Sequence, residues 1–265
     1  MPTQAADPPP LAVTGLRKSF GGVRVLHDFE LTIPARSRSA VAILGQNGAG
    51  KTTLLNLITR LVPADGGSIE VFGHNVLASG ARHLAGYGVA RTFQSPRLLL
   101  DETSLNNVAL GAWSVRRGRD GGSAAAMRRA ADALDRVGLA AQAGRITGTL
   151  PFGSRKLVEL ARALALRPRL LLLDEPAAGL SDLEETRLAG VLTGLTDAGI
   201  TLLLIEHRMA LVAATAGRVV MMDGGAIVFD GDAAAAIASP LVRERYLGAG
   251  FDQANPAEPR GSERP

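Results

Sequence analysis

The chain contains 265 residues, of which 46% are hydrophobic and only 4% aromatic, so its core must be built chiefly from aliphatic side chains and alanine. It contains no cysteine, which excludes disulfides and thiolate metal sites and fits a reducing compartment. The formal net charge of +4 is weak evidence for any particular partner.

Arginine supplies most of the positive charge, since only three of the 29 basic residues are lysines, namely Lys18, Lys51 and Lys156. The densest basic stretch covers residues 116–119 and has only Trp113 as an aromatic neighbour. Surfaces that bind nucleic acid usually combine clustered basic residues with interleaved aromatics. We therefore expect this stretch to be a solvated helical face or a membrane-proximal surface, and we expect no nucleic-acid partner.

Proline and polar residues dominate both ends of the chain, at residues 1–10 and 251–265. Such segments have little to bury, so we expect two disordered tails around one domain over residues 11–250. The beginning of the chain lacks the layout of a secretory signal. The longest apolar runs are about six residues, far below the ~20 needed to span a bilayer, so no membrane span is expected.

Short strands and turns alternate over residues 11–72. Gly21-Gly22 separates strands expected at residues 16–20 and 23–31, which indicates a hairpin. A further strand is expected at residues 68–72. This part of the chain therefore predicts an antiparallel β region near the N-terminus.

A glycine-rich segment at residues 45–53 lies between apolar runs at 40–44 and 54–58. At a strand-to-helix turn, glycines allow tight turns and backbone N–H groups converge on an anion. The spacing is that of a P-loop, in which Lys51 reaches the β- and γ-phosphates and the Thr52 hydroxyl ligates Mg²⁺. The predicted nucleotide-binding residues of this segment are Gly45, Gln46, Asn47, Gly48, Ala49, Gly50, Lys51, Thr52 and Thr53.

An inserted helical subdomain is expected at about residues 95–168. Apolar residues recur at helical spacing over 127–137, and a second apolar stripe over 157–164 ends before Pro168. Ser154 is a residue type suited to cap the start of this second helix.

Two adjacent carboxylates, Asp174 and Glu175, follow four leucines at residues 170–173. The leucines predict a buried strand whose C-terminal end presents the carboxylates. Asp174 can then hold Mg²⁺, and Glu175 can orient or deprotonate a water in line with the γ-phosphate. The alternative is an ordinary strand ending in a charged turn, and the P-loop upstream favours the catalytic interpretation.

A further buried strand at residues 201–205 ends in Glu206 and His207, and a hairpin at 219–229 closes the domain. We expect His207 to lie on the strand next to that of Asp174, within reach of the γ-phosphate or the attacking water. Strands separated by helices predict a parallel sheet with crossover connections. The expected fold class is α/β: a P-loop NTPase with a parallel-sheet core, an N-terminal antiparallel β region and an inserted helical subdomain.

The ordered series of motifs resembles that of ATP-binding-cassette (ABC) ATPases over about residues 11–250. A P-loop alone fits many kinases and GTPases, but this chain adds Phe20 in the first hairpin, Gln94 after a strand, and His207. The resemblance implies that Phe20 stacks on adenine, with core packing as the alternative. It also implies that residues 178–182 touch the opposite subunit of a dimer.

The resemblance further implies an ATPase that uses ATP with Mg²⁺. Its catalytic residues would be Glu175, His207 and Gln94, and its metal-binding residues Thr52, Gln94 and Asp174. A signature segment that contacts the ATP of the partner subunit is formed by Leu150, Pro151, Phe152, Gly153 and Ser154.

This signature departs from the usual Leu-Ser-Gly-Gly-Gln of the family. Pro151 removes a hydroxyl and a backbone N–H that could donate to phosphate, whereas Gly153 and the helix N-terminus remain. We hypothesise that the ATP completed by this signature is held less tightly than usual.

Three stretches resemble the ATPase subunits of branched-chain (hydrophobic) amino acid importers, at residues 88–98, 204–209 and 242–248. An aromatic at the third signature position, here Phe152, is also familiar in that group. Arg208 departs, because an aspartate commonly follows the switch histidine. Related cassettes import urea and short amides, so these stretches say little about the solute.

The resemblance implies a mechanism and a set of partners. Two cassettes, this one and an identical or related ATPase subunit, close around two ATP molecules. Closure moves the helical subdomains, which grip two transmembrane permease subunits, and an extracytoplasmic solute-binding protein delivers the solute. We expect a peripheral subunit on the cytoplasmic face of the cell membrane.

Three rival functions stay open. A soluble ABC ATPase acting on ribosomes or DNA usually has two cassettes or long coiled-coil insertions, which this chain lacks. An exporter ATPase for lipid or polysaccharide shares every catalytic motif. A module that binds ATP without hydrolysis is disfavoured by Glu175 and His207, although Pro151 keeps it open.

Restoring serine to the signature (Pro151→Ser) should tighten ATP-dependent dimerisation, because it returns an N–H and a hydroxyl that can donate to phosphate. One hydrogen bond to a charged group contributes about 1.5–3 kcal/mol, so the ATP concentration needed for half-maximal dimerisation should fall about tenfold or more. Sedimentation velocity over an ATP titration measures this, with Pro151→Ala as the variant that returns only the N–H. Unchanged dimerisation and an unchanged ATPase rate would show the hypothesis to be wrong.

Overall fold

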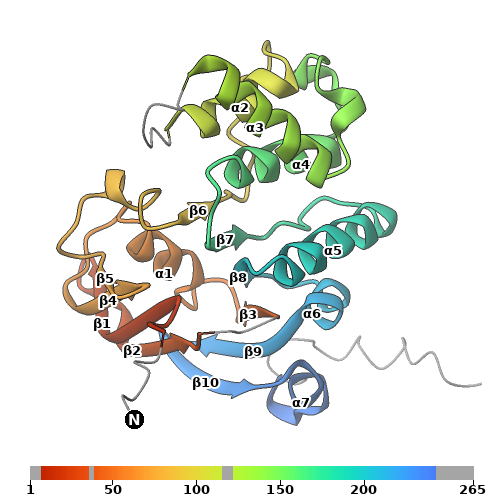
Figure 1. Cartoon of the computed structure of the whole chain (residues 1–265). Helices are drawn as coiled ribbons and strands as arrows, with labels where there is room; N and C mark the ends of the chain where they lie inside the picture. Colours follow the sequence, from red (N-terminus) through yellow and green to blue (C-terminus); the bar gives the residue numbers. More distant parts are fainter. Residues whose placement is uncertain (1–6, 36–38, 115–121, 243–265) are drawn as a thin grey trace, which may run out of the picture.

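The computed structural model describes residues 7–35, 39–114 and 122–242, which form an α/β core with a helical lobe beside it (Figure 1). The tail expected at 251–265 and the basic stretch at 116–119 lie outside the described residues, as does most of the motif at 242–248.

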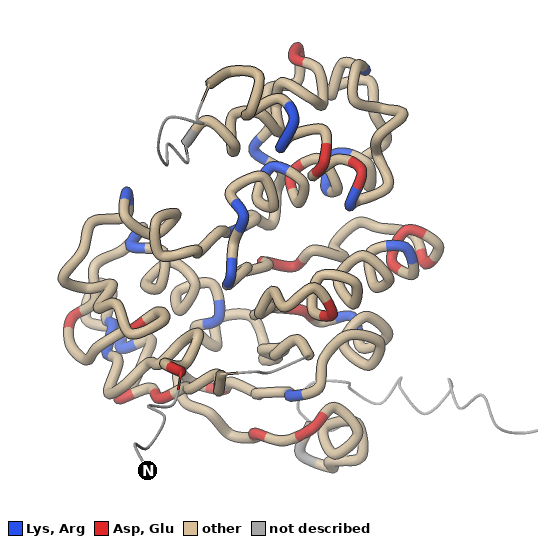
Figure 2. Tube along the Cα trace, viewed as in Figure 1, with Lys and Arg blue, Asp and Glu red and all other residues tan. Residues whose placement is uncertain are grey.

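Basic and acidic residues are interspersed along the chain in both the core and the lobe (Figure 2). Within the described part of the chain, no helix combines the length and the apolar character needed to cross a membrane.

A six-stranded sheet forms the centre of the core, in the order β10-β9-β3-β8-β7-β6. All neighbours pair in parallel except β10, which runs antiparallel to β9. Every residue of β3, β7 and β8 is buried, because both faces of the sheet are covered. The α/β fold class with a parallel-sheet core is confirmed. The strands are β3 (Ala40–Leu44), β6 (Val89–Arg91), β7 (Leu170–Asp174), β8 (Thr201–Ile205), β9 (Ala216–Asp223) and β10 (Ala226–Gly231).

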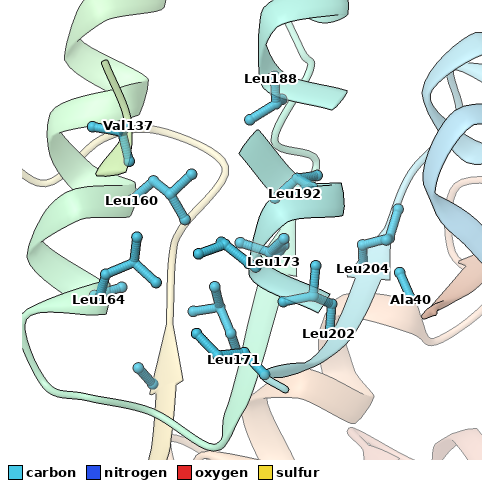
Figure 3. Packing of buried hydrophobic residues seen from close by; sticks show 14 of the residues in the cluster. Ala40, Val137, Leu160, Leu164, Leu171, Leu173, Leu188, Leu192, Leu202 and Leu204 are labelled. Atoms are coloured by element: carbon cyan, nitrogen blue, oxygen red, sulfur yellow. The ribbon is translucent and has the colours of Figure 1, made fainter. Parts of the chain in front are cut away.

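Alternate residues of the central strands enter two separate cores, as the period of two in a strand requires. On one face Val41, Leu172 and Leu203 pack with helix α1 (Lys51–Ile58) and the antiparallel sheet. On the other face Leu171 and Leu173 of β7 and Leu202 and Leu204 of β8 pack with three helices, and Figure 3 labels leucines from two of these helices. These helices are α4 (Phe152–Leu164), α5 (Asp182–Asp197) and α6 (Met209–Thr215).

A four-stranded antiparallel sheet covers α1 in the order β2-β1-β4-β5. The predicted hairpin is confirmed: Gly21 and Gly22 have φ angles of 52° and 85°, the positive values that a tight two-residue turn between twisted strands requires. The first two strands are longer than expected, because apolar residues continue to be buried at both outer ends. The strands are β1 (Leu11–Phe20), β2 (Val23–Ile33), β4 (Gly66–Val71) and β5 (His74–Asn75).

Three helices, α2 (Ser104–Ser114), α3 (Ser123–Arg136) and α4, pack together as a lobe in the region where the sequence predicts a helical subdomain (Figure 1). The remaining helices, α7 (Ala233–Ala238) and α8 (Pro240–Val242), follow the sheet.

The expectation that Ser154 caps α4 is wrong. The helix begins at Phe152 with Pro151 in the capping position, so Ser154 lies inside the first turn. The φ angle of Pro151 is −54°, and a proline ring holds this value without cost at a helix start.

Candidate functional site

Four loops meet at the carboxyl edge of the central sheet. The strand order places β8 between β3 and β7, with β6 beyond β7. The loops after these strands carry the P-loop, His207, Glu175 and Gln94, and parallel pairing brings them to the same edge. They line a cavity of about 510 Å³ whose residues are Gly45, Gln46, Asn47, Lys51, Gln94, Glu175, Glu206 and His207.

Backbone geometry at the P-loop requires glycine. Gly45 has a φ of 150°, and a Cβ added there would lie 2.3 Å from the backbone oxygen of Met222. Gly48 and Gly50 have φ angles of 87° and 99°, in the left-handed region that favours glycine. The loop therefore turns closely beside β9 and opens directly into α1.

Lys51 lies inside the loop. Its Nζ donates to the carbonyl oxygens of Gly45 at 2.6 Å and Gln46 at 2.9 Å. Burial lowers the pKa of the Lys51 ammonium, while Glu175 and Asp174 act in the opposite direction. The ammonium is thus held next to the cavity, where a lysine of a P-loop is expected to meet phosphate.

Asp174 forms a buried ion pair with Arg91 of β6. Nη2 of Arg91 lies 2.8 Å from Oδ2 of Asp174, and the two side chains are only 6% and 5% exposed. The other terminal nitrogen of Arg91, Nη1, donates to Asn56 on α1 at 2.8 Å and to Thr59, directly after α1, at 3.0 Å. One guanidinium therefore connects β6, β7 and α1 directly beneath the site.

The oxygen atoms that could bind a metal here fit magnesium better than they fit a metal bound by protein side chains alone. Within the ranges described, no three His, Asp or Glu side chains gather as a metal-binding cluster. Magnesium is usually held by one or two carboxylates or hydroxyls together with waters and substrate phosphates. Asp174 accepts from Arg91 through Oδ2 and has a second carboxylate oxygen with which to bind a metal or its water. Thr52 is exposed at the start of α1.

Glu175 adopts a left-handed backbone conformation with a φ of 47°. Its Oε2 accepts a hydrogen bond of 2.6 Å from Nε2 of Gln94. Two residues that the sequence predicts to be catalytic are therefore in direct contact, although they come from loops 81 residues apart.

The backbone of His207 is held by its buried neighbour Glu206. Oε2 of Glu206 accepts from the backbone N–H groups of His207 at 2.7 Å and Arg208 at 2.9 Å, and Oε1 accepts from Ala177 at 2.8 Å. This carboxylate thereby connects the loop after β8 to the loop after β7. The His207 side chain is 53% exposed and lines the cavity.

Arg208, where the sequence departs from the resemblance, has partners of its own. Nη1 donates to the carbonyl oxygen of Leu180 at 2.8 Å, and Nη2 pairs with Asp182 at 2.7 Å. Its Nε also pairs with the buried Glu185 of α5. An arginine at this position therefore fastens the histidine loop to the segment at residues 178–182.

The structure does not bring every predicted site residue to the cavity. Phe20 ends β1 with 46% of its surface exposed, with Nζ of Lys18 5.0 Å from its ring centre. Of the five signature residues, Pro151 caps α4 and Phe152, Gly153 and Ser154 form its first turn, and the ring of Phe152 contacts Gly179. Neither Phe20 nor the signature belongs to the described lining of the cavity.

Three charged residues that the sequence does not single out lie behind the site and contact it: Arg91, Glu206 and Lys156. Each is a charged side chain next to, or inside, an apolar element, and buried charges need partners. This pattern indicates from the sequence that these residues have polar partners, although only the fold identifies the partners.

The chain is similar to known proteins over most of its length. The sequence profile of the ABC transporter family matches residues 26–178, more than half of the chain. The chain belongs to the ABC transporter family. Members of this family are ATPases coupled to transport, so the chain is the ATP-hydrolysing subunit of a transporter.

Relatives within the ABC transporter family match over most of their length. The high-affinity branched-chain amino acid transport ATP-binding protein BraF of Pseudomonas aeruginosa is 34% identical, with 91% of this chain and 98% of BraF covered. The aliphatic sulfonates import ATP-binding protein SsuB of Cupriavidus necator is 40% identical, with 92% of this chain and 74% of SsuB covered.

Solved ABC cassettes share the fold. A nucleotide-free ATP-binding cassette from an ABC transporter has a TM-score of 0.79 at 27% identity, covering 91% of this chain and 99% of that one. A cassette in its ADP conformation gives a TM-score of 0.79 at 29% identity with the same coverage. The prediction of an ABC ATPase fold is confirmed.

Removing Arg91 should destabilise the protein strongly, because Asp174 would be left as a buried, unpaired charge. We expect Arg91→Leu to lower the free energy of unfolding by about 3–5 kcal/mol, measured by urea denaturation. Adding Asp174→Asn should recover part of this loss, since a neutral amide needs no opposite charge.

The matched control is Arg17→Leu, which breaks an ion pair with Asp28 whose side chains are 59% and 77% exposed. An exposed pair contributes about 1 kcal/mol or less, so this variant should be close to wild type. Equal losses for Arg17→Leu and Arg91→Leu would contradict the interpretation.

Proposed function

We propose that this chain powers the uptake of branched-chain or other hydrophobic amino acids through separate permease subunits. The observation that carries the proposal is the similarity to BraF, which extends over 98% of that protein. The stretches at residues 88–98 and 204–209 support the same subfamily, and they include Arg91, Gln94, Glu206 and His207, which the fold brings to one edge.

In the proposed reaction, the P-loop binds the phosphates of ATP. Backbone N–H groups of residues 45–50 and the N-terminal end of α1 favour negative charge. Lys51 would exchange its hydrogen bonds to the carbonyls of Gly45 and Gln46 for bonds to the β- and γ-phosphates. Phe20, exposed at the end of β1, supplies a flat surface for adenine.

Hydrolysis is proposed to depend on Glu175, Gln94 and His207. The Glu175 carboxylate orients or deprotonates the attacking water, for which it must share or release the bond from Gln94. His207, held at its backbone by Glu206, donates toward the γ-phosphate or the water. The exchange of the Gln94 bond gives the loop after β6 a direct means to sense the nucleotide.

Magnesium would be held by Asp174, Thr52 and Gln94, and it would supply positive charge beside the β- and γ-phosphates. The buried pair with Arg91 fixes the position of the Asp174 carboxylate before the metal arrives. The described residues therefore contribute a prepared oxygen ligand rather than a complete metal cage.

The proposed dimer follows from the position of the signature, which would complete the ATP site of a second cassette. The signature residues 150–154 lie away from the cavity of their own chain, which supports their use in a second cassette. We propose a homo- or heterodimer of cassettes on the cytoplasmic face of the membrane, bound to two permease subunits and served indirectly by an extracytoplasmic solute-binding protein. The domain limits 11–250, with a helical subdomain at about 95–168, remain part of this proposal.

A second candidate solute is an aliphatic sulfonate. The observation in its favour is the 40% identity to SsuB, which exceeds the identity to BraF, although only 74% of SsuB is covered. Both candidates use the same ATPase site and differ in the permease and the binding protein.

The deciding experiment measures ATPase activity of the complex that a tagged copy of the chain captures from its own membranes. Candidate solutes with their binding proteins are added in turn: leucine-type amino acids, aliphatic sulfonates, and urea or short amides. We expect permease subunits to co-purify and leucine-type amino acids to stimulate hydrolysis. Stimulation by another solute alone would reassign the cargo, and capture without any membrane protein would overturn the transport proposal.

Glu175→Gln is the control that shows whether the measured ATP hydrolysis depends on the site of this chain. It should lower turnover to near background while ATP binding persists, and an ATP-bound dimer should accumulate in gel filtration. An amide keeps the shape of the carboxylate but cannot accept a proton from water. Unchanged turnover would remove Glu175 from the catalytic role.

A further inference from the structure

The backbone of Glu175 is held in an unusual conformation. Its φ of 47° lies in the left-handed region, which residues other than glycine seldom adopt. Such conformations persist only where surrounding contacts enforce them, and they concentrate at functional sites. The contacts that enforce this one therefore also determine where the Glu175 carboxylate points.

Hydrogen bonds fix both ends of the Glu175 backbone. Its N–H donates to the carbonyl oxygen of Ile205 at 2.9 Å. Its carbonyl oxygen accepts from Nζ of Lys156 at 2.8 Å and from the N–H of Ala178 at 3.1 Å. Lys156 is the one side chain in this set, and it comes from a different subdomain.

Lys156 is costly to bury. It is only 9% exposed, and burial lowers the pKa of its ammonium despite the nearby carboxylates of Glu206, Glu159 and Glu175. Burying a charged amine costs free energy unless hydrogen bonds and opposite charges compensate. An apolar residue would fill this position in α4 more favourably, so stability alone does not account for a lysine.

Lys156 joins the lobe to the core. It lies in the second turn of α4, whereas Glu175 immediately follows β7 of the central sheet. One turn earlier in α4, the ring of Phe152 covers Gly179 in the same loop. The start of α4 therefore rests on the Glu175 loop at two points, and a rotation of the lobe would displace both.

We propose that Lys156 is a positioning residue: its hydrogen bond to the Glu175 carbonyl holds the carboxylate in place for hydrolysis and makes this placement depend on the position of α4. The inference rests on the proposed role of Glu175 in catalysis. It assigns no contact with ATP to Lys156, which acts through the Glu175 backbone.

The test compares three variants of the full-length chain: Lys156→Met, Lys156→Arg and Arg129→Met. Methionine keeps the length of the side chain without its charge, and arginine restores a donor. Arg129 is the matched control, since it also donates to a backbone carbonyl, that of Ala112 at 3.0 Å, but entirely within the lobe. Steady-state hydrolysis, equilibrium ATP binding and the midpoint of thermal unfolding are measured for each.

We expect Lys156→Met to lower kcat by about tenfold to a hundredfold, the range that a small misplacement of a catalytic group causes, while KM and ATP binding stay near wild type. Its unfolding midpoint should be equal or higher, because a buried charge has been removed. Lys156→Arg should recover part of kcat, and Arg129→Met should keep all of it.

Two results would overturn the inference: an unchanged kcat in Lys156→Met, or a fall in kcat accompanied by a matching fall in the unfolding midpoint without recovery in Lys156→Arg. Failure of the proposed function looks different. In that case Glu175→Gln would hydrolyse ATP as fast as wild type, whatever the Lys156 variants did.

Discussion

Parallel pairing of β3, β8, β7 and β6 is the constraint on which the rest of the structure depends. It brings four loops that are far apart in the sequence to one edge, where they line a single cavity. Parallel strands need covered faces, and the two separate apolar cores supply that cover. The sheet therefore positions the residues of the site, while the helices and the second sheet exclude water from its strands.

Charged residues beneath the cavity hold the site residues in fixed positions. Arg91 ties Asp174 to α1, Glu206 ties the histidine loop to the loop after β7, and Lys156 ties Glu175 to the lobe. Two of these links, from Arg91 to Asn56 of α1 and from Lys156 of α4 to Glu175, join elements that the backbone ladder of the sheet does not connect. Hydrogen bonds of this kind are strong where they are buried, so a shift of one element displaces the site residues that are bonded to it.

The departures from the family pattern also have physical consequences. Arg208 stands where an aspartate is common, and it pairs with Asp182 and the buried Glu185. Pro151 caps α4 with a φ angle of −54°, which its ring favours, so this proline also defines where the helix begins. Arg208 therefore joins the histidine loop to the segment at 178–182 and to α5.

The sequence by itself determined the fold class, the P-loop and the catalytic candidates, because each depends on local patterns: glycine spacing at 45–50, apolar runs, and polar residues directly after strands. It could not place Lys156 against Glu175 or Arg91 against Asp174, pairs that lie 19 and 83 residues apart. It also misplaced the cap of α4. Partners of buried charges are chosen by which elements pack together, and only the tertiary structure decides that packing.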